Sequence, residues 1–292
     1  MPSLKDFAHI LRENVPLAHL TSMKVGGPAR YLFEPRNDGE LVSLVDALRR
    51  DRIPFRILGG GTNVIAPDDG LPGAVVRLAG EFARLDFEGP LVTAGAAAAL
   101  PRFVGECARK GLAGAEGLVG IPGTVGGALV MNSGGRWGTI GSIVDSVRVL
   151  DAEVAPRTLA AREIIFDYRH SSLKGSIVLS AVFRMNESDP QSVQAAAARI
   201  LNAKRAAQDL AAASAGCIFK NPPGGTSAGA LIDRAGLKGL RQGAAMVSDV
   251  HANFIVNTGG AAARDVLALA QLVKSRVLEA FDVDLEFEVE LW

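Results

Sequence analysis

The chain has 292 residues, of which 48% are hydrophobic, and its 31 basic residues balance its 31 acidic residues. This length predicts roughly two domains with sizeable cores, and the balanced charge gives no global field that would draw the protein to nucleic acid or an anionic membrane. Because Cys107 and Cys217 are the only cysteines, we expect no disulfide scaffold and a reducing compartment, for which the cytoplasm is the simplest placement.

The N-terminal segment lacks the continuous apolar stretch of a signal peptide. Its apolar residues Leu4, Phe7, Ile10 and Leu11 recur at helical spacing, which predicts an amphipathic helix that docks on the core. No part of the sequence approaches the ~20 apolar residues that span a bilayer. We therefore expect a soluble protein.

Residues 29–185 combine helix-type and strand-type patterns, which indicates mixed α and β structure. A helix is predicted from Asp38, which could cap it, to about Arg50. Further strands and a second helix are predicted in this part of the chain. The strands cover residues 29–34, 55–58, 74–78, 91–94, 143–150 and 177–185, and a second helix covers residues 100–110.

The texture changes after Asn186, where an alanine-rich run predicts a helix over residues 193–212. Beyond it we predict strands at 217–220 and 252–257, helices at 228–235 and 262–280, and a closing strand. The expected fold class is α+β, with a domain boundary near Glu187. The predicted domains are residues 1–187, divided into subdomains at about 1–79 and 80–187, and residues 188–292.

Residues 117–138 are unusually rich in glycine. Glycine permits positive φ and lacks a Cβ, so Gly120, Gly123, Gly126 and Gly127 can turn several N–H groups toward one anion, for which a pyrophosphate is the natural candidate. An ordinary surface loop explains this segment equally well when it is considered alone.

A second glycine run, Gly59 to Gly61, is followed by Thr62 and Asn63 at the junction between a strand and a turn. The two runs together suggest a clamp around one nucleotide. Neither fits a Rossmann fingerprint or a P-loop, because no GxGxxG opens a long helix and no Gly-Lys-Ser/Thr follows.

Short motifs are spread over nearly the whole chain. They are Thr21 with VGGPA at 25–29, LGGGTNVI at 58–65, GIPGTVGGA at 120–128, Asn132, YRHS at 168–171, AGCIFKNP at 215–222, AGLKG at 235–239 and LEFEV at 285–289. In their residues and in their order, these motifs resemble those of the UDP-N-acetylenolpyruvoylglucosamine reductase (MurB) family.

The resemblance implies an α+β fold with a two-part FAD-binding region of the MurB and vanillyl-alcohol-oxidase-like (PCMH-type) superfamily. A C-terminal substrate domain follows, whose last strand returns a catalytic glutamate to the cleft. The short spacing between YRHS and AGCIFKNP is similar to the family's shorter form, which lacks a tyrosine-bearing loop. The implied FAD-binding residues are Gly59, Gly60, Gly61, Thr62, Asn63, Val64, Ile121, Pro122, Gly123, Thr124, Gly126, Gly127 and Asn132.

The reaction implied by the resemblance belongs to peptidoglycan precursor synthesis. NADPH reduces FAD, and hydride then passes to the enolpyruvyl group of UDP-N-acetylglucosamine enolpyruvate, which yields UDP-N-acetylmuramate. Hydride at the terminal carbon leaves enolate character beside the carboxylate. The site therefore needs a positive charge there and a proton donor for the adjacent carbon.

The resemblance implies that Arg169, in YRHS, stabilises the enolate, because a guanidinium keeps its charge and can bind a carboxylate through two hydrogen bonds. Without the resemblance, a structural ion pair explains this arginine better. The neighbouring Tyr168 is expected to pack in the core.

Cys217 stands where the proton donor of the family is most often serine. A thiol, with an ordinary pKa near 8.5, can still donate a proton. The alternative is a buried structural cysteine, which is the role that we expect for Cys107.

Residues 283–291 alternate between apolar and acidic residues, which is typical of a half-buried strand. Asp284, Glu286, Glu288 and Glu290 then share one face, and a solvated acidic face is the default interpretation. The match of LEFEV to the family alone selects Glu288, which would assist protonation or balance charge at the enolate.

The resemblance also implies that Lys220 and Asn221 lie against the substrate, with Asn221 near its diphosphate. Lys204 and Arg205 are further candidates for phosphate contact, although a charged pair on a long helix usually faces solvent. We expect a structural role for His251 and no metal site, because the four histidines lack paired spacing.

Three other functions remain open. Cys217 could be a nucleophile with His251 or His170 as its base, in a hydrolase or acyltransferase. The chain could also be another FAD-dependent sugar or alcohol oxidoreductase of the same superfamily, or a flavin-binding homologue that has lost activity. We expect a cytoplasmic monomer that binds NADPH and UDP-N-acetylglucosamine enolpyruvate, without nucleic acid or membrane partners.

Overall fold

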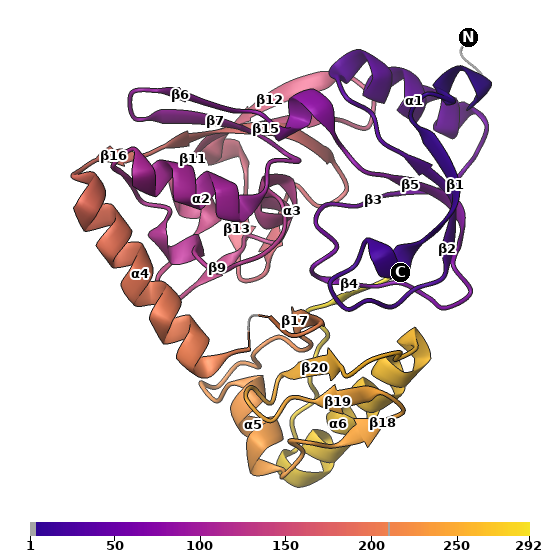
Figure 1. The fold of residues 1–292 in the computed structure, drawn as a ribbon, viewed down its shortest axis with the longest axis vertical. Coiled ribbons are helices and arrows are strands. Elements are labelled where there is room, and N and C mark those ends of the chain that lie inside the picture. The colour runs from indigo at the N-terminus through magenta and orange to yellow at the C-terminus, as the bar shows by residue number, and fades with distance from the viewer. Residues whose placement is uncertain (1–3, 210) are drawn as a thin grey trace. The chain divides into compact units, whose positions relative to one another are not determined.

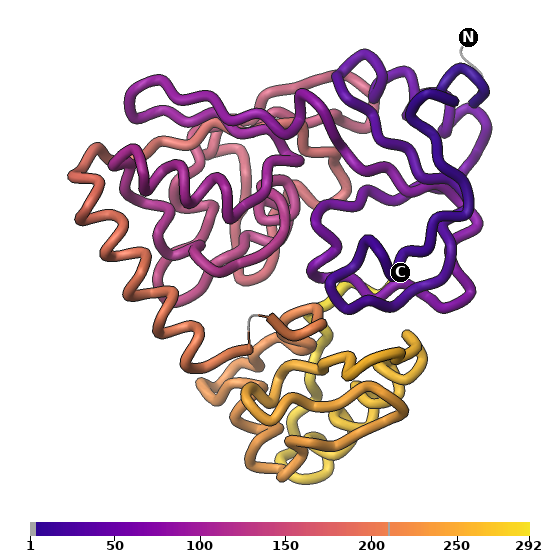
Figure 2. Tube along the Cα trace, in the orientation of Figure 1, coloured from indigo at the N-terminus to yellow at the C-terminus, as the bar shows by residue number. Residues whose placement is uncertain are grey.

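The computed structural model describes residues 4–209 and 211–292. Its chain forms two compact units, each built from separate stretches of sequence (Figure 1). The first unit comprises Met1–Glu13, Tyr31–Gly60 and Gly73–Lys204, and the second comprises Asn14–Arg30, Gly61–Pro72 and Arg205–Trp292. Figure 2 traces the same path, with the last segment of the second unit in orange and yellow. The assignment of cofactor and substrate binding to either side of residue 187 stays a prediction.

Helix α1 (Asp38–Arg50) begins at a side-chain cap. The side-chain oxygen of Asn37 accepts the Glu40 N–H at 3.0 Å, and the Glu40 carboxylate accepts the Arg36 N–H at 2.7 Å. The cap is therefore one residue earlier than the predicted Asp38, because an asparagine with extended backbone supplies the oxygen that the first turn needs.

The prediction of an amphipathic helix at the N-terminus is wrong. The described residues of this segment form one short 3-10 helix, η1 (Leu4–Phe7). Strand β1 (Leu11–Pro16) follows it, and the Ile10 carbonyl accepts the Glu34 N–H at 2.9 Å. Phe7 and Ile10 are still buried, so the apolar spacing identified core residues but not their backbone conformation. A four-stranded sheet has the order β1, β2 (Pro28–Phe33), β5 (Leu71–Val76) and β3 (Phe55–Ile57).

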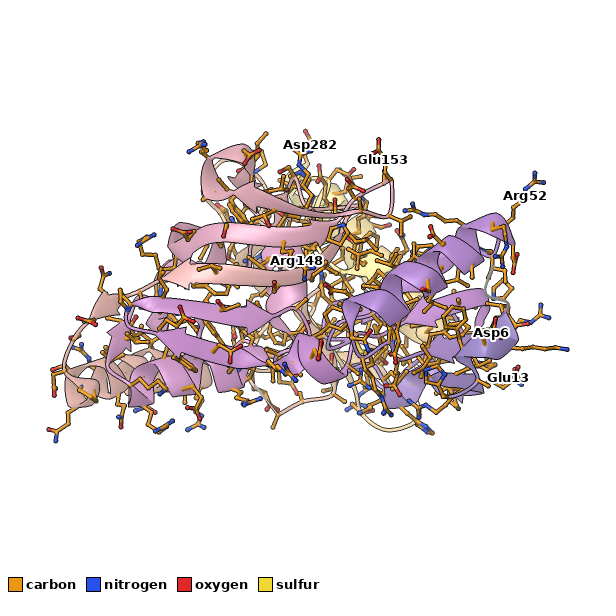
Figure 3. All side chains as sticks on the ribbon, turned by 90° about the horizontal axis from the view of Figure 1, so that it is seen from above. Asp6, Glu13, Arg52, Arg148, Glu153 and Asp282 are labelled. Carbon is orange, nitrogen blue, oxygen red and sulfur yellow. The ribbon has the colours of Figure 1, made fainter. Side chains whose placement is uncertain are left out.

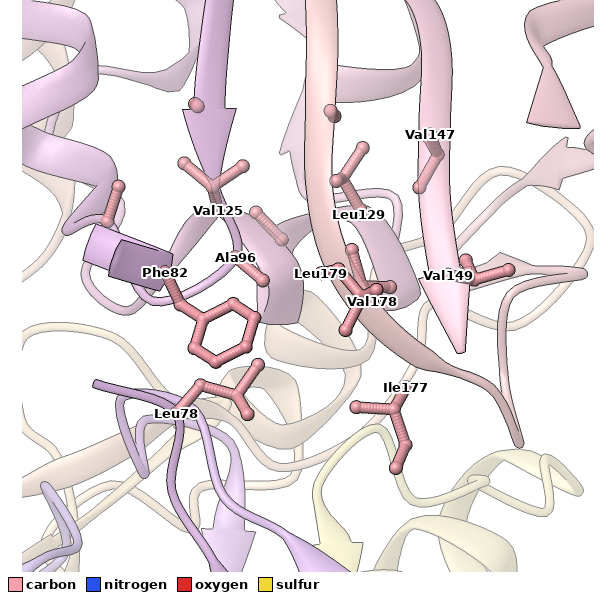
Figure 4. Close-up of a cluster of buried hydrophobic side chains, with 14 of the residues drawn as sticks. Leu78, Phe82, Ala96, Val125, Leu129, Val147, Val149, Ile177, Val178 and Leu179 are labelled. Carbon is pink, nitrogen blue, oxygen red and sulfur yellow. The ribbon is translucent and has the colours of Figure 1, made fainter. Parts of the chain in front are cut away.

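A five-stranded antiparallel sheet carries the core of the first unit. Its order is β12 (Pro156–Ala160), β11 (Val144–Leu150), β15 (Ile177–Arg184), β7 (Leu91–Gly95) and β6 (Leu85–Glu88). Helix α3 (Val125–Val130) packs on β7 and β15, and helix α2 (Leu100–Arg109) packs beside it. Figure 4 shows Val125 and Leu129 of α3 among Val147, Val178 and Leu179 of the sheet. The predicted strands and helices of this region are confirmed to within a few residues.

Charged side chains lie at the surface of the first unit. Figure 3 shows Arg52 and Glu153 pointing away from the ribbon. Arg148 of β11, in contrast, forms an ion pair with Asp38 in the first turn of α1. Both side chains are partly exposed, so this ion pair contributes more to the orientation of α1 and β11 than to the free energy of unfolding.

The second unit has its own antiparallel sheet. The order is β17 (Ser214–Cys217), β20 (Phe254–Asn257), β19 (Ala245–Val247) and β18 (Arg241–Gln242), and α5 (Ala228–Arg234) and α6 (Ala263–Phe281) contribute to its core. A parallel pair joins β4 (Val64–Ile65) to β21 (Glu290–Leu291). The predicted closing strand over residues 283–291 is therefore regular only at its end.

The remaining elements are short, apart from one helix. Helix α4 (Pro190–Ala207) begins earlier and ends earlier than the predicted helix over residues 193–212. Residue 210 of that predicted range lies outside the described residues. Strand β8 (Leu112–Ala113) pairs with β16 (Asn186–Glu187). Among the described residues, no helix combines the length and apolar character that crossing a membrane requires.

The N-terminus of α6 is capped by a residue from a distant part of the sequence. The two carboxylate oxygens of Asp68 accept the N–H groups of Ala263 at 2.7 Å and Arg264 at 3.0 Å. A negative charge here also complements the helix dipole. This contact fixes residues 61–72 to the longest helix of the second unit.

We expect Asp68→Ala to lower the free energy of unfolding by about 1 kcal/mol, because two helix N–H groups lose their acceptor. Denaturant unfolding monitored by circular dichroism measures this change. Asp69→Ala is the matched control, since Asp69 is an exposed neighbour that makes no hydrogen bond to α6 among the described residues. An equal loss in both variants would contradict the capping role.

Candidate functional site

The two glycine runs meet within the first unit. A Cβ added to Gly60 would lie 2.6 Å from the Gly123 Cα, and one added to Gly59 would lie 2.7 Å from Thr124 Oγ1. A side chain at Gly60 would force the two backbones apart, and one at Gly59 would collide with the Thr124 hydroxyl. The prediction that the runs lie together is confirmed for Gly59 and Gly60.

The N–H groups of these runs differ in their partners. Gly126 donates to the Ala96 carbonyl at 2.8 Å, and Gly127 donates to Thr124 Oγ1 at 3.4 Å, so the expectation that these two glycines present free N–H groups is wrong. In the described part of the chain, the N–H groups of Gly59, Gly60, Gly123 and Thr124 have no protein acceptor.

These four donors suit a ligand with anionic oxygens, and the Gly120 N–H likewise has no protein acceptor among the described residues. Gly60 is exposed, and Gly59, Gly123 and Thr124 are half-buried, so a ligand can reach them. Converging backbone N–H groups that lack protein acceptors are a common phosphate cradle. The residues present therefore fit the pyrophosphate of a dinucleotide. Ile121 and Pro122 lead into this cradle, half-buried and exposed respectively.

The second half of the GGGTN run belongs to the second unit. Gly61 has a φ of +64°, and a Cβ there would lie 2.0 Å from the Leu20 carbonyl oxygen. Asn63 Nδ2 donates to the Glu288 carbonyl at 3.2 Å, and the Glu290 N–H donates to the Asn63 carbonyl at 2.9 Å. The half-buried Thr62 precedes this contact and Val64 pairs in β4, so the segment is built into the unit.

Asn132 lies buried at the end of α3, with a φ of +42°. Its Nδ2 donates to the Asp167 carbonyl at 2.9 Å, and its Oδ1 accepts the Gly141 N–H at 3.2 Å. The amide therefore links the start of the YRHS turn to the backbone at Gly141. A side-chain contact of Asn132 with a cofactor stays a prediction.

Arg169 lies at the tip of the hairpin formed by β13 (Phe166–Asp167) and β14 (His170–Ser171). Its φ of +55° is uncommon for a residue with a side chain, and its Nη1 donates to the Gly134 carbonyl at 2.8 Å. The prediction that Tyr168 packs in the core is wrong: it is 49% exposed because the hairpin loop turns it outward.

Lys204 supports the glycine-rich segment, a role that its position in the sequence does not indicate. Its Nζ donates to the carbonyls of Gly117 at 3.0 Å and Val119 at 2.7 Å, and lies 5.7 Å from the ring centroid of Trp137. Burial, with the positive charge of Arg169, lowers the pKa of Lys204 to about 8. The one available signal was its position on a long helix, which equally suits a solvent-facing residue.

Trp137 lies in the tight hairpin of β9 (Gly134–Gly135) and β10 (Gly138–Thr139). Arg136 precedes Trp137 in the chain, and its guanidinium lies 4.0 Å from the centroid of the Trp137 ring. Two cations therefore contact this indole, which is 36% exposed.

In the second unit, the segments that contain Cys217 and Glu288 run side by side. The Glu288 N–H donates to the Ile218 carbonyl at 2.8 Å, and the Lys220 N–H donates to the Glu286 carbonyl at 2.8 Å. Between them Phe219 and Phe287 form an antiparallel bridge with ring centroids 5.3 Å apart. The structure thus brings together the backbones of two of the three predicted catalytic residues.

The four acidic residues near the C-terminus do not share one environment. Asp284 pairs with Lys274 at 2.7 Å and Glu286 pairs with Lys220 at 3.3 Å, and both acids are exposed. Glu288 and Glu290 are half-buried. The expectation of one uniform solvated face is wrong, because strand geometry persists over two residues only.

The predicted substrate contacts Lys220 and Asn221 have local partners. Lys220 pairs with Glu286, and Asn221 Oδ1 accepts the Ala228 N–H at 3.0 Å at the start of α5. These contacts order the loop between β17 and α5. Substrate binding by Lys220 and Asn221 stays a prediction.

Cys107 and His251 both have buried surroundings. Cys107 is fully buried in α2, where burial raises the pKa of its thiol to about 12, so its predicted structural role is confirmed. The His251 ring lies 4.7 Å from that of Phe254, and burial lowers the pKa of this histidine. Cys217 is half-buried.

The lowered pKa of Lys204 predicts a pH-dependent stability. From pH ~8 up to 10.5, the unfolded chain holds the Lys204 proton more tightly than the folded chain, so the contribution of Lys204 to the free energy of unfolding rises with pH. We expect the free energy of unfolding of wild type, relative to that of Lys204→Met, to increase between about pH 7 and about pH 10. Urea unfolding measures both values.

Lys204→Arg is the control for this prediction, because a guanidinium does not titrate in this range. The difference in the free energy of unfolding between Lys204→Arg and Lys204→Met should stay constant with pH. A constant difference for wild type as well would contradict the lowered pKa.

Comparison with known proteins gives one consistent answer. Residues 208–292 match the model of the UDP-N-acetylenolpyruvoylglucosamine reductase C-terminal domain, and residues 29–154 match that of an FAD-binding domain. The UDP-N-acetylenolpyruvoylglucosamine reductase 2 of Symbiobacterium thermophilum is 43% identical over 97% of this chain and 92% of its own length. The reductase of Syntrophobacter fumaroxidans is 41% identical over 94% of this chain and 82% of its own length.

Solved structures agree. The crystal structure of the reductase (MurB) from Thermus caldophilus has a TM-score of 0.85 at 42% identity and covers 97% of this chain and 99% of its own. Bermuda grass isoallergen BG60 has a TM-score of 0.50 at 18% identity, covers 64% of this chain and 44% of its own, and so shares the fold alone. With family models at both ends and relatives above 40% identity along nearly its full length, the chain belongs to the UDP-N-acetylenolpyruvoylglucosamine reductase family.

Proposed function

We propose that this protein reduces UDP-N-acetylglucosamine enolpyruvate to UDP-N-acetylmuramate, with NADPH as the electron donor. The observation that carries the proposal is the near-complete match to reductases of this name, together with the neighbouring backbones of Cys217 and Glu288. Bound FAD supplies the hydride chemistry, since it can be reduced by NADPH and can reduce the enolpyruvyl double bond.

The FAD pyrophosphate would be held by the glycine cradle of the first unit. The N–H groups of Gly59, Gly60, Gly123 and Thr124 supply four donors without protein acceptors among the described residues. Lys204 holds the carbonyls of Gly117 and Val119, just before the cradle. These contacts order the backbone before the ligand binds, which lowers the entropy cost of binding.

Three side chains of this chain serve the substrate. Arg169 binds the enolpyruvyl carboxylate and stabilises the enolate that forms when hydride reaches the terminal carbon. The Cys217 thiol gives its proton to the adjacent carbon and regains one from solvent, and Glu288 assists this transfer. Arg169 belongs to the first unit, and Cys217 and Glu288 belong to the second.

The remaining assignments follow from this function. We propose that the protein acts in the cytoplasm as a monomer and that Lys220 and Asn221 contact the substrate. The match to reductases along the chain favours this function over a sugar or alcohol oxidoreductase, a cysteine hydrolase or an inactive homologue. The flavin absorbance allows the activity to be tested directly.

The first experiment is an anaerobic visible spectrum of the purified protein loaded with FAD. We expect one equivalent of NADPH to bleach the flavin absorbance, and UDP-N-acetylglucosamine enolpyruvate then to restore it. UDP-N-acetylglucosamine, which lacks the double bond, is the control and should restore nothing. A protein that bleaches but is not reoxidised by the enolpyruvate would refute the proposed substrate.

We expect Cys217→Ala to slow the reoxidation step by roughly 100-fold or more, because the proton donor is lost. Cys217→Ser should keep turnover, since a hydroxyl can donate. Stopped-flow absorbance separates the two steps, and bleaching by NADPH should be unchanged in both variants. Equal losses in both steps would contradict the proton-donor role.

A further inference from the structure

The backbone of Glu288 is held on both sides by segments far away in sequence. Its N–H donates to the Ile218 carbonyl at 2.8 Å, next to Cys217. Its carbonyl accepts from Asn63 Nδ2 at 3.2 Å. Both polar groups of the Glu288 backbone are therefore fixed, one by the cysteine segment and the other by the side chain of Asn63.

Asn63 contacts the C-terminal segment twice. Besides the amide contact to Glu288, its own carbonyl accepts the Glu290 N–H at 2.9 Å. The parallel pairing of β4 with β21 starts directly after it, with Glu290 opposite Val64. Parallel strands cannot offer a backbone N–H to every carbonyl at their ends, so the Asn63 amide supplies the donor that the Glu288 carbonyl needs.

We propose that Asn63 is a positioning residue that orients Glu288 for the proposed reaction. This inference rests on the proposed role of Glu288. It assigns the side chain of Asn63 to the catalytic segment, whereas its sequence context in GGGTN suggests a ligand of the cofactor. A shift of Glu288 by a fraction of an ångström changes the geometry of proton delivery without changing how the flavin is reduced.

The test measures the two half-reactions of FAD-loaded Asn63→Ala by stopped-flow absorbance. We expect reoxidation by UDP-N-acetylglucosamine enolpyruvate to slow by about 10-fold to 100-fold, and FAD binding and bleaching by NADPH to stay within about 3-fold of wild type. Asn63→Asp should be at least as slow in reoxidation, because it places an oxygen against the Glu288 carbonyl.

A double variant separates positioning from an independent contribution. If Asn63 acts through Glu288, Asn63→Ala combined with Glu288→Ala is no slower in reoxidation than Glu288→Ala alone. Multiplied effects would overturn the proposal. So would an Asn63→Ala protein that loses FAD, or a Glu288→Ala protein with normal reoxidation.

Asn257→Ala is the matched control. Asn257 Nδ2 also donates to a backbone carbonyl of the second unit, that of Met23 at 3.0 Å, and its Oδ1 accepts the N–H groups of Gly259 and Ala261, but no hydrogen bond joins Asn257 to Glu288 among the described residues. We expect this variant to keep the wild-type reoxidation rate. A slowing equal to that of Asn63→Ala would show a general loss of stability and overturn the proposal.

Amide hydrogen exchange provides a readout that does not depend on the reaction. We expect Asn63→Ala to speed exchange in residues 286–292, and Asn257→Ala to leave that segment unchanged. If wild type is not reoxidised by the enolpyruvate, the proposed function fails, and the exchange result still tests the contact. Unchanged exchange of residues 286–292 in Asn63→Ala would overturn the positioning role.

Discussion

The second unit depends on backbone pairing between segments that are remote in sequence. Asn63 and Glu288 are 225 positions apart, yet their contact, with the β4 and β21 pairing beside it, fixes the segment that ends at Trp292. On its other side this segment pairs with residues 218–220. Without these two sets of hydrogen bonds, residues 286–292 would lack a fixed path and Glu288 would lack a fixed position.

The first unit depends on a different constraint, the close approach of two backbones that only glycine allows. At Gly60 a side chain would collide with the Gly123 backbone, whereas Gly127 has space around it. The two glycines therefore serve different purposes, although the sequence presents them alike. Among the residues that the structure describes, N–H groups without protein acceptors lie where the two runs touch, which is where a phosphate can be reached from both.

Much of the fold was predictable where one pattern dominated. The periodicity of α1, α2 and α6 and the apolar runs of β11 and β15 placed these elements to within a few residues. The N-terminal helix failed because hydrogen bonding to a neighbouring segment outweighed helical spacing, and the closing strand failed because alternation specifies faces, not pairing partners.

The candidate site was predictable from motifs and less so from physics. Motif matching selected Glu288 from four similar acids, and the structure distinguishes Glu288 and Glu290 from the others by burial. Lys204 and the side-chain contact of Asn63 were not predictable, because their partners are backbone carbonyls of distant segments. No residue type in the sequence marks a carbonyl that needs a donor.

The non-contiguous second unit has a consequence for the order in which the protein can be made. Its sheet, its helix α6 and the β4 strand all lie in one core or ladder with residues 285–291, which are synthesised after all of these elements. Residues 14–30 and 61–72 can hydrogen-bond to each other, as Gly27 does to Pro67 at 2.8 Å, but they must wait for the C-terminal part of their unit before its core can form. The first unit has no such requirement once Lys204 has emerged, so a chaperone that shields the early segments would act on the second unit.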